Sequence, residues 1–156
     1  MFNELVELLK KNNKTISTAE SLTGGLIASK IVDIAGSSAV LNEAYITYSN
    51  EAKMRILGVK AETIDKYDVV STEVTEEMAE GLFKISNANI CVATSGYAGP
   101  TGKNVGKVCI TIKYNVTYYD YVNNYSEYTT RNSIREQTAN FVCKKIIEML
   151  KEEDRW

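Results

Sequence analysis

Histidine is absent from this chain of 156 residues. Its absence excludes Ser-His-Asp and Cys-His catalytic centres and every metal site that uses an imidazole ligand. If the chain is a hydrolase, its general base must be a lysine, a carboxylate, a tyrosine or the N-terminal amine. A hydrolytic centre in this sequence therefore needs a less common base.

Cysteine is scarce, and a long apolar run is missing. Cys91, Cys109 and Cys143 are far apart, and each lies in an apolar stretch. We expect small buried side chains, since nothing resembles the CxxC spacing of a metal site. No run approaches the roughly 18 apolar residues of a membrane-spanning helix. The start of the chain, MFNELVELLKKNN, is amphipathic and lacks the apolar core of a signal peptide. We therefore expect a cytoplasmic protein with no membrane partner.

Charge and length narrow the function classes further. The net charge of −2 gives no bulk attraction to nucleic acid. The length fits one domain over residues 1–156, without repeats or linkers. We expect no metal and no cofactor, and we expect a homo-oligomer.

Hydrophobic periodicity predicts the order of helices and strands. Turn and cap residues divide the chain at Gly36 and Gly58, and Ser71 or Thr72 is expected to open a helix that runs to about Ser86. The turn of the β-rich stretch lies near Asn115 or at Asn123-Asn124, and the pattern does not decide between them. Helices are expected over 2–12, about 22–32, 50–58, 72–86 and from about 133, with a turn at 61–66, and strands over 15–19, 42–48, 88–94 and 106–130.

Residues 18–53 hold most of the plausible chemistry. Ser21 or Thr23 is expected to cap the helix that follows, with Gly24-Gly25 in its first turn. Glycine costs about 1 kcal/mol against alanine in a helix, so the pair suggests close approach of a ligand or of another backbone. A helix N-terminus can bind an anion. A ligand site and a tightly packed, capped helix both remain open.

Lys53 is the candidate base. Ser49 or Asn50 is expected to cap a helix that places Lys53 near its positive end. That position disfavours the ammonium ion and favours the neutral amine that a general base requires. The alternative is a solvated surface lysine.

A glycine-rich loop, SGYAGPTG at 95–102, follows the buried strand ICVAT. Such loops are where α/β proteins bind ligands. The GKN that follows is not a phosphate-binding P-loop, because Gly96 is one residue too early and Asn104 replaces the hydroxyl that would hold magnesium. Phosphoryl transfer is therefore a weak interpretation. Arg131 and Arg135 begin the last helix, where a nearby anion would explain them.

Four motifs in one order resemble the CinA C-terminal domain family: AESLTGG (19–25), AGSSAV (35–40), YSNEAK (48–53) and SGYAGP (95–100). The resemblance covers roughly residues 3–150. It implies an α/β fold, a three-layer α/β/α sandwich with a mixed sheet. Stand-alone members are nicotinamide-nucleotide amidohydrolases, so it also implies deamidation of nicotinamide mononucleotide to nicotinate mononucleotide and ammonia by a serine–lysine centre.

The resemblance also assigns roles to residues. Ser38 would be the nucleophile, Lys53 its base, and Tyr48 would orient the pair; Ser21 is the alternative nucleophile. The substrate would be bound by Ser21, Thr23, Gly24, Ser95, Gly96 and Arg131, with Arg131 on the phosphate. Tyr97 stands where the family commonly has isoleucine. The competing hypothesis is a non-catalytic nucleotide-binding or protein-interaction module of the same family.

Overall fold

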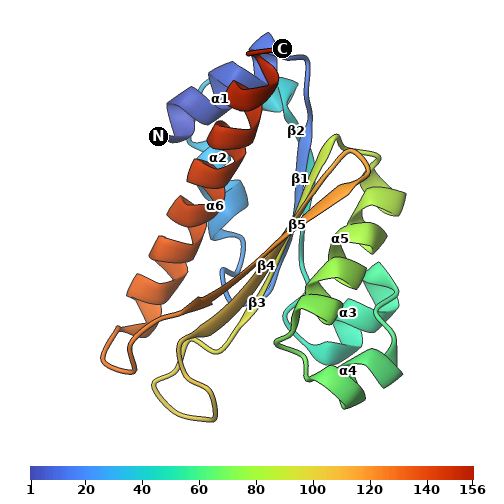
Figure 1. The fold of residues 1–156 in the computed structure, drawn as a ribbon, viewed down its shortest axis with the longest axis vertical. Helices are drawn as coiled ribbons and strands as arrows, with labels where there is room; N and C mark the ends of the chain where they lie inside the picture. Colours follow the sequence, from blue (N-terminus) through green and yellow to red (C-terminus); the bar gives the residue numbers. More distant parts are fainter.

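A five-stranded sheet runs through the centre of the computed structural model, which describes residues 1–156 (Figure 1). The strand order is β2-β1-β3-β4-β5. β1 is parallel to both β2 and β3, while β4 is antiparallel to β3 and to β5. The sheet is therefore mixed, as predicted. The strands are β1 (Ile16–Glu20), β2 (Leu41–Ile46), β3 (Ile90–Gly96), β4 (Lys107–Tyr114) and β5 (Thr117–Asn124).

Helices cover both faces of the sheet (Figure 1). One layer holds α1 (Phe2–Lys11), α2 (Leu26–Val32) and α6 (Arg131–Glu153), and the other holds α3 (Asn50–Leu57), α4 (Ala61–Tyr67) and α5 (Thr72–Ser86). Each side has its own buried apolar cluster, a larger one under α1 and α6 and a smaller one under α5. The predicted three-layer α/β/α sandwich is confirmed. No helix is both long enough and apolar enough to cross a bilayer.

Cap residues in the sequence correctly predicted where several helices begin or end. The Ser49 and Ser71 hydroxyls accept N–H groups at the starts of α3 and α5, and Gly58 ends α3 in the left-handed conformation. The turn expected at 61–66 is wrong, since that segment is helix α4. The last helix begins at Arg131, earlier than the expected start at about residue 133, because Thr130 caps it.

The sheet ends position the site. Asn115 and Val116 form the turn of the β4–β5 hairpin, which decides between the two predicted turn positions. Because β1, β2 and β3 are parallel, their carboxyl ends meet at one edge of the sheet. Ser21, Thr47 and the loop after Gly96 leave the sheet there.

Candidate active site

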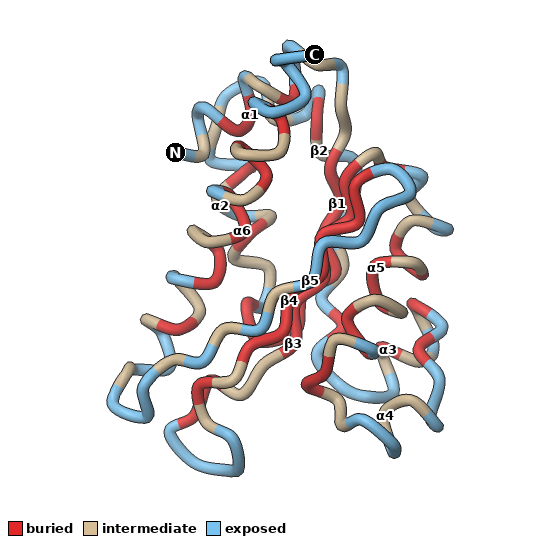
Figure 2. Tube along the Cα trace, in the orientation of Figure 1, coloured by how far each residue is buried: buried red, intermediate tan, exposed pale blue.

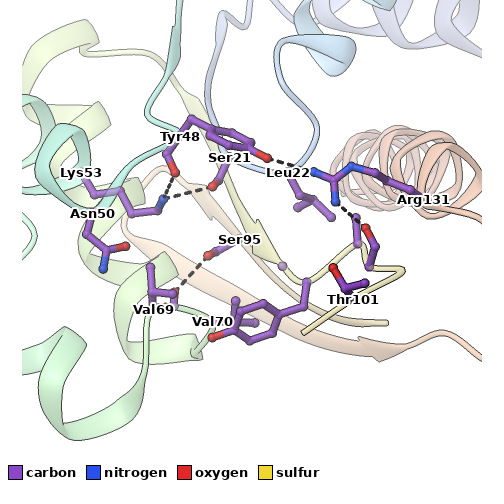
Figure 3. A pocket seen from close by; sticks show the side chains of 14 residues that line it. Ser21, Leu22, Tyr48, Asn50, Lys53, Val69, Val70, Ser95, Thr101 and Arg131 are labelled. Carbon is purple, nitrogen blue, oxygen red and sulfur yellow. Dashed lines mark hydrogen bonds between the residues drawn. The ribbon is translucent and has the colours of Figure 1, made fainter. Parts of the chain in front are cut away.

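A cavity of about 250 Å³ lies at the carboxyl ends of β1 and β3 (Figure 3). Figure 2 shows the buried strands that lead into this end of the sheet. Four stretches of chain and the start of α6 form its walls. The lining residues are Ser21, Leu22, Tyr48, Asn50, Lys53, Val69, Val70, Ser95–Gly99, Thr101 and Arg131.

Lys53 lies at the inner end of this cavity with its amine buried. The residue is 1% exposed. Its Nζ lies 3.0 Å from the Ser21 Oγ and 3.2 Å from the Tyr48 carbonyl oxygen (Figure 3). It also lies 2.9 Å from the Thr47 carbonyl oxygen. No carboxylate forms an ion pair with it. The interpretation of Lys53 as a solvated surface residue is therefore wrong.

Burial without a counter-ion changes the acidity of this amine. Desolvation lowers the pKa of Lys53 from 10.5 to about 8. A neutral amine has two N–H groups, which the carbonyl oxygens of Thr47 and Tyr48 can accept. Its lone pair is then directed at the third neighbour, and the Ser21 hydroxyl can donate to it. The same three oxygens can each accept one N–H of the ammonium form, so the contacts fit both protonation states of Lys53.

The start of α3 places Lys53 here. The Ser49 hydroxyl accepts the Ala52 N–H at 3.0 Å and fixes the first helical turn. Lys53 lies in that turn, as predicted, and its side chain folds back toward the end of β2. The peptide dipoles there also disfavour a positive charge.

Glu20 holds the backbone that carries Ser21. Its carboxylate is completely buried and accepts the N–H groups of Ile27 and Ala28 and the hydroxyl of Thr18, each at 3.0 Å. These contacts tie the end of β1 to the start of α2. The predicted anion site at this helix is occupied by the chain's own carboxylate. Sequence reasoning missed Glu20; the only local signal was a single acid between the predicted strand and the glycine pair.

The Gly24-Gly25 pair precedes α2 and is not part of its first turn. Both glycines have left-handed backbones, with φ of 58° and 92°, and neither Ser21 nor Thr23 caps the helix. A side chain on Gly25 would come within 3.0 Å of the Ile46 side chain. The pair therefore serves a tight turn and a close approach.

Arg131 and Arg135 bind backbone carbonyl groups. Arg131 donates to the Gly99 oxygen at 2.6 Å and to the Tyr48 hydroxyl at 2.9 Å, which joins three segments at the mouth of the cavity (Figure 3). Arg135 donates to the oxygens of Leu22 and Thr23 at 2.9 and 3.1 Å. These carbonyls partly account for the two cations at a helix start.

One wall of the cavity depends on Asp68. Its carboxylate accepts the Tyr97 hydroxyl at 2.6 Å and the Val69 N–H at 2.8 Å. Its φ of 76° is unusual for a residue with a side chain. The Ser95 hydroxyl donates to the Val69 oxygen at 2.9 Å, so strand β3 and this turn are joined beside the cavity. Sequence reasoning did not identify Asp68.

The predicted site residues separate into two groups. Ser21, Tyr48, Lys53, Ser95, Gly96 and Arg131 line one cavity. Thr23 and Gly24 do not line it, and the buried Thr23 hydroxyl lies 3.0 Å from that of Thr94. Ser38 is exposed on a short 3-10 turn (Ser37–Ala39) before β2, whereas Lys53 follows β2. Six strand residues, roughly 20 Å, separate them. The predicted Ser38–Lys53 pair is therefore wrong within one chain, and the alternative partner, Ser21, contacts the amine.

A comparison of the sequence with models of protein families identifies the family of this chain. The model of the CinA C-terminal domain matches residues 1–150. The chain belongs to the CinA C-terminal domain family. A CinA-like protein of Fervidobacterium nodosum is 54% identical over 116 residues, which cover 72% of this chain and 28% of that protein. A CinA-like protein of Thermotoga neapolitana is 41% identical over 97% of this chain and 37% of its own length. The chain thus spans about a third of these curated relatives.

Solved structures agree with this assignment. A competence-damaged protein (CinA) superfamily protein from Klebsiella pneumoniae superposes with a TM-score of 0.92 at 27% identity, over 97% of this chain and 96% of that one. The competence/damage inducible protein CihA from Agrobacterium tumefaciens gives a TM-score of 0.86 at 36% identity, over 95% and 96% of the two chains. The fold is therefore that of the CinA superfamily throughout.

Proposed function

We propose that this chain is an amidohydrolase that converts nicotinamide mononucleotide and water to nicotinate mononucleotide and ammonia. The observation that supports it most directly is the buried Lys53 amine, with a pKa of about 8, 3.0 Å from the Ser21 hydroxyl. A base of this kind can activate a serine without histidine. The substrate itself is inferred from the family resemblance.

The proposed reaction uses one serine and one lysine. Neutral Lys53 takes the hydroxyl proton as the Ser21 Oγ attacks the carboxamide carbon. The resulting ammonium ion returns that proton to the departing nitrogen, which leaves as ammonia, and an ester to Ser21 remains. Lys53 then takes a proton from the water that attacks the ester carbon, and it returns that proton to the Ser21 Oγ as the ester C–O bond breaks, so the acid product departs with Ser21 and neutral Lys53 restored.

Backbone groups beside Ser21 can stabilise the oxyanion of this reaction. The N–H groups of Leu22, Ala98 and Gly99 donate to no backbone or side-chain acceptor, and all three residues line the cavity. Fixed N–H donors at a developing oxyanion are worth roughly 3–4 kcal/mol each in other hydrolases. We assign the carbonyl oxygen of the substrate to these donors.

Arg131 is the proposed contact for the phosphate. It lies at the cavity mouth, and its two contacts there are to neutral oxygens, which leave its positive charge without a carboxylate. Tyr48 is uncharged, and its hydroxyl accepts an N–H of the Arg131 guanidinium. Arginine suits phosphate through paired N–H donors.

Ammonia release from nicotinamide mononucleotide tests the proposal. We expect Ser21→Ala and Lys53→Ala each to lower turnover by about a thousandfold or more. Ser38→Ala is the matched control, because Ser38 is exposed and outside the cavity, and it should remain within about twofold of wild type. Loss of activity in Ser38→Ala but not in Ser21→Ala would contradict the Ser21 assignment. Binding without turnover by wild type would instead support the nucleotide-binding module.

A further inference from the structure

The outer edge of β5 is uncovered. β5 is the last strand of the sheet, and no other element pairs with its free side (Figure 1). Residues 117–120, 122 and 124 are exposed, and the strand is drawn largely as exposed in Figure 2. Its unpaired N–H and C=O groups are available to another strand.

This edge lacks the features that normally prevent pairing. Its eight residues, TYYDYVNN, contain no lysine, arginine or proline. Their register with β4 is regular over the whole length, without a bulge. Natural edge strands are usually short, bulged or guarded by such residues. β5 is long and regular, and Asp120 is its only charged residue.

Exposed apolar side chains gather on the same hairpin. Val116, Tyr118, Tyr119 and Val122 are all among the exposed large hydrophobic residues, and Val122 is 49% exposed. Because side chains alternate along a strand, Tyr118 and Val122 lie on one face of β5 and Tyr119 lies on the opposite face, so both faces carry apolar side chains next to the free edge.

The alternation of hydrogen bonds along β5 shows which of its N–H and C=O groups point away from β4. The Tyr125 N–H donates to the Gly106 oxygen on the β4 side at 2.8 Å. Inward and outward groups alternate along an antiparallel strand. The odd-numbered residues of β5 therefore bond to β4, and the outward groups belong to Tyr118, Asp120, Val122 and Asn124.

We propose that this edge pairs antiparallel with β5 of a second copy of the chain, about a two-fold axis at Val122. In this register residues 120–124 of the two antiparallel strands pair, which satisfies the outward groups of Asp120, Val122 and Asn124, and the two sheets become one sheet of twice the width. The inference does not depend on the proposed catalytic function, and it gives the expected homo-oligomer a defined interface.

The charge of Asp120 favours one register between the two β5 strands. An axis at Asp120 would place two carboxylates directly opposite each other, and an axis at Tyr121 would leave them on adjacent diagonal positions. An axis at Val122 places Asp120 opposite Asn124 of the second copy, whose amide can donate to it. The two Asp120 carboxylates then lie roughly 14 Å apart, beyond the Debye length at physiological salt. Val122 of one copy lies opposite Val122 of the other, and the two side chains form an apolar pair.

Sedimentation of the full chain tests the interface. Wild type should be a dimer at micromolar concentration. Val122→Lys should weaken the dimer at least about tenfold, because it opposes two like charges at the axis. Val116→Lys is the matched control, since Val116 is an exposed valine of the same hairpin outside the paired residues. An equimolar mixture of Val122→Lys and Val122→Asp should dimerise again.

Three results would overturn the proposal. These are a wild type that stays monomeric at high micromolar concentration, a dimer that Val122→Lys leaves intact, and a Lys–Asp mixture that remains monomeric. Oxidation of Val122→Cys gives an independent check, because opposed residues about 5.5 Å apart can form a disulfide. The three native thiols are buried, and Val116→Cys should not cross-link.

Discussion

The pH dependence of turnover tests the chemistry of Lys53 quantitatively. With a pKa of about 8, roughly a tenth of the Lys53 side chains are neutral at pH 7, against roughly 0.03% for a lysine at 10.5. If the neutral amine is the base, kcat/KM should rise about tenfold between pH 7 and pH 9 and then level off. An unperturbed lysine would instead give about a hundredfold rise over the same interval, still continuing at pH 10.

The assay is initial-rate ammonia release from nicotinamide mononucleotide between pH 7 and pH 10. This range avoids the phosphate of the substrate, which titrates near pH 6. An enzyme-free blank and a circular dichroism spectrum at each pH separate background hydrolysis and unfolding from catalysis. Lys53→Arg should stay at background throughout, because a guanidinium does not deprotonate. A flat profile, or a midpoint near 10.5, would refute the role of the desolvated amine.

Three further predictions concern stability and are checked by urea denaturation. Because the pKa of Lys53 is lower in the folded chain than in the unfolded one, folding releases a proton between about pH 8 and pH 10.5. The free energy of unfolding of wild type should therefore rise relative to Lys53→Met across that window, and a constant difference would contradict the buried amine. Glu20→Gln should cost about 2–4 kcal/mol, because the two N–H groups bind different carboxylate oxygens and the NH2 that replaces one oxygen would face an N–H donor; an unchanged midpoint would refute the tie between β1 and α2. Gly81→Ala should cost about 3 kcal/mol or more, since its Cβ would lie 1.9 Å from the Leu57 oxygen; wild-type stability would show that α3 can move away from α5.

Local chemistry made the helices around the site predictable. Ser49, Ser71 and Gly58 act within one turn of their own helices, so their roles can be identified from neighbouring residues alone. The absence of histidine also reduced the candidate bases to lysine, a carboxylate, a tyrosine or the N-terminal amine. Lys53 and Ser21 were therefore both candidates before their distance was known.

The pairing of the two could not be predicted in the same way. Ser38 is nearer to Lys53 in sequence than Ser21 is, but β2 carries the chain away from Ser38 before Lys53 is reached. The parallel register of Glu20 with Ile46 places Ser21 beside Thr47 and hence beside the Lys53 amine. Strand order and register are long-range properties, and no local pattern in the chain specifies them.

Glu20 illustrates the same limit for a buried charge. A glutamate beside a glycine pair predicts neither a ligand site nor an internal cap until the position of α2 is known. The structure shows that the helix N–H groups bind this carboxylate. The start of α2 was therefore correctly identified as a place for an anion, but that anion is part of the protein.

The distribution of the three thiols gives this protein internal reporters of local opening. Cys91 lies in the apolar cluster under α5, whereas Cys143 belongs to the cluster under α6, and neither forms a disulfide. Burial raises the pKa of both thiols, that of Cys143 to about 12, so each is unreactive while its layer is closed. The labelling rates of Cys91 and Cys143 with a thiol reagent would therefore report separately how often each helical layer lifts from the sheet.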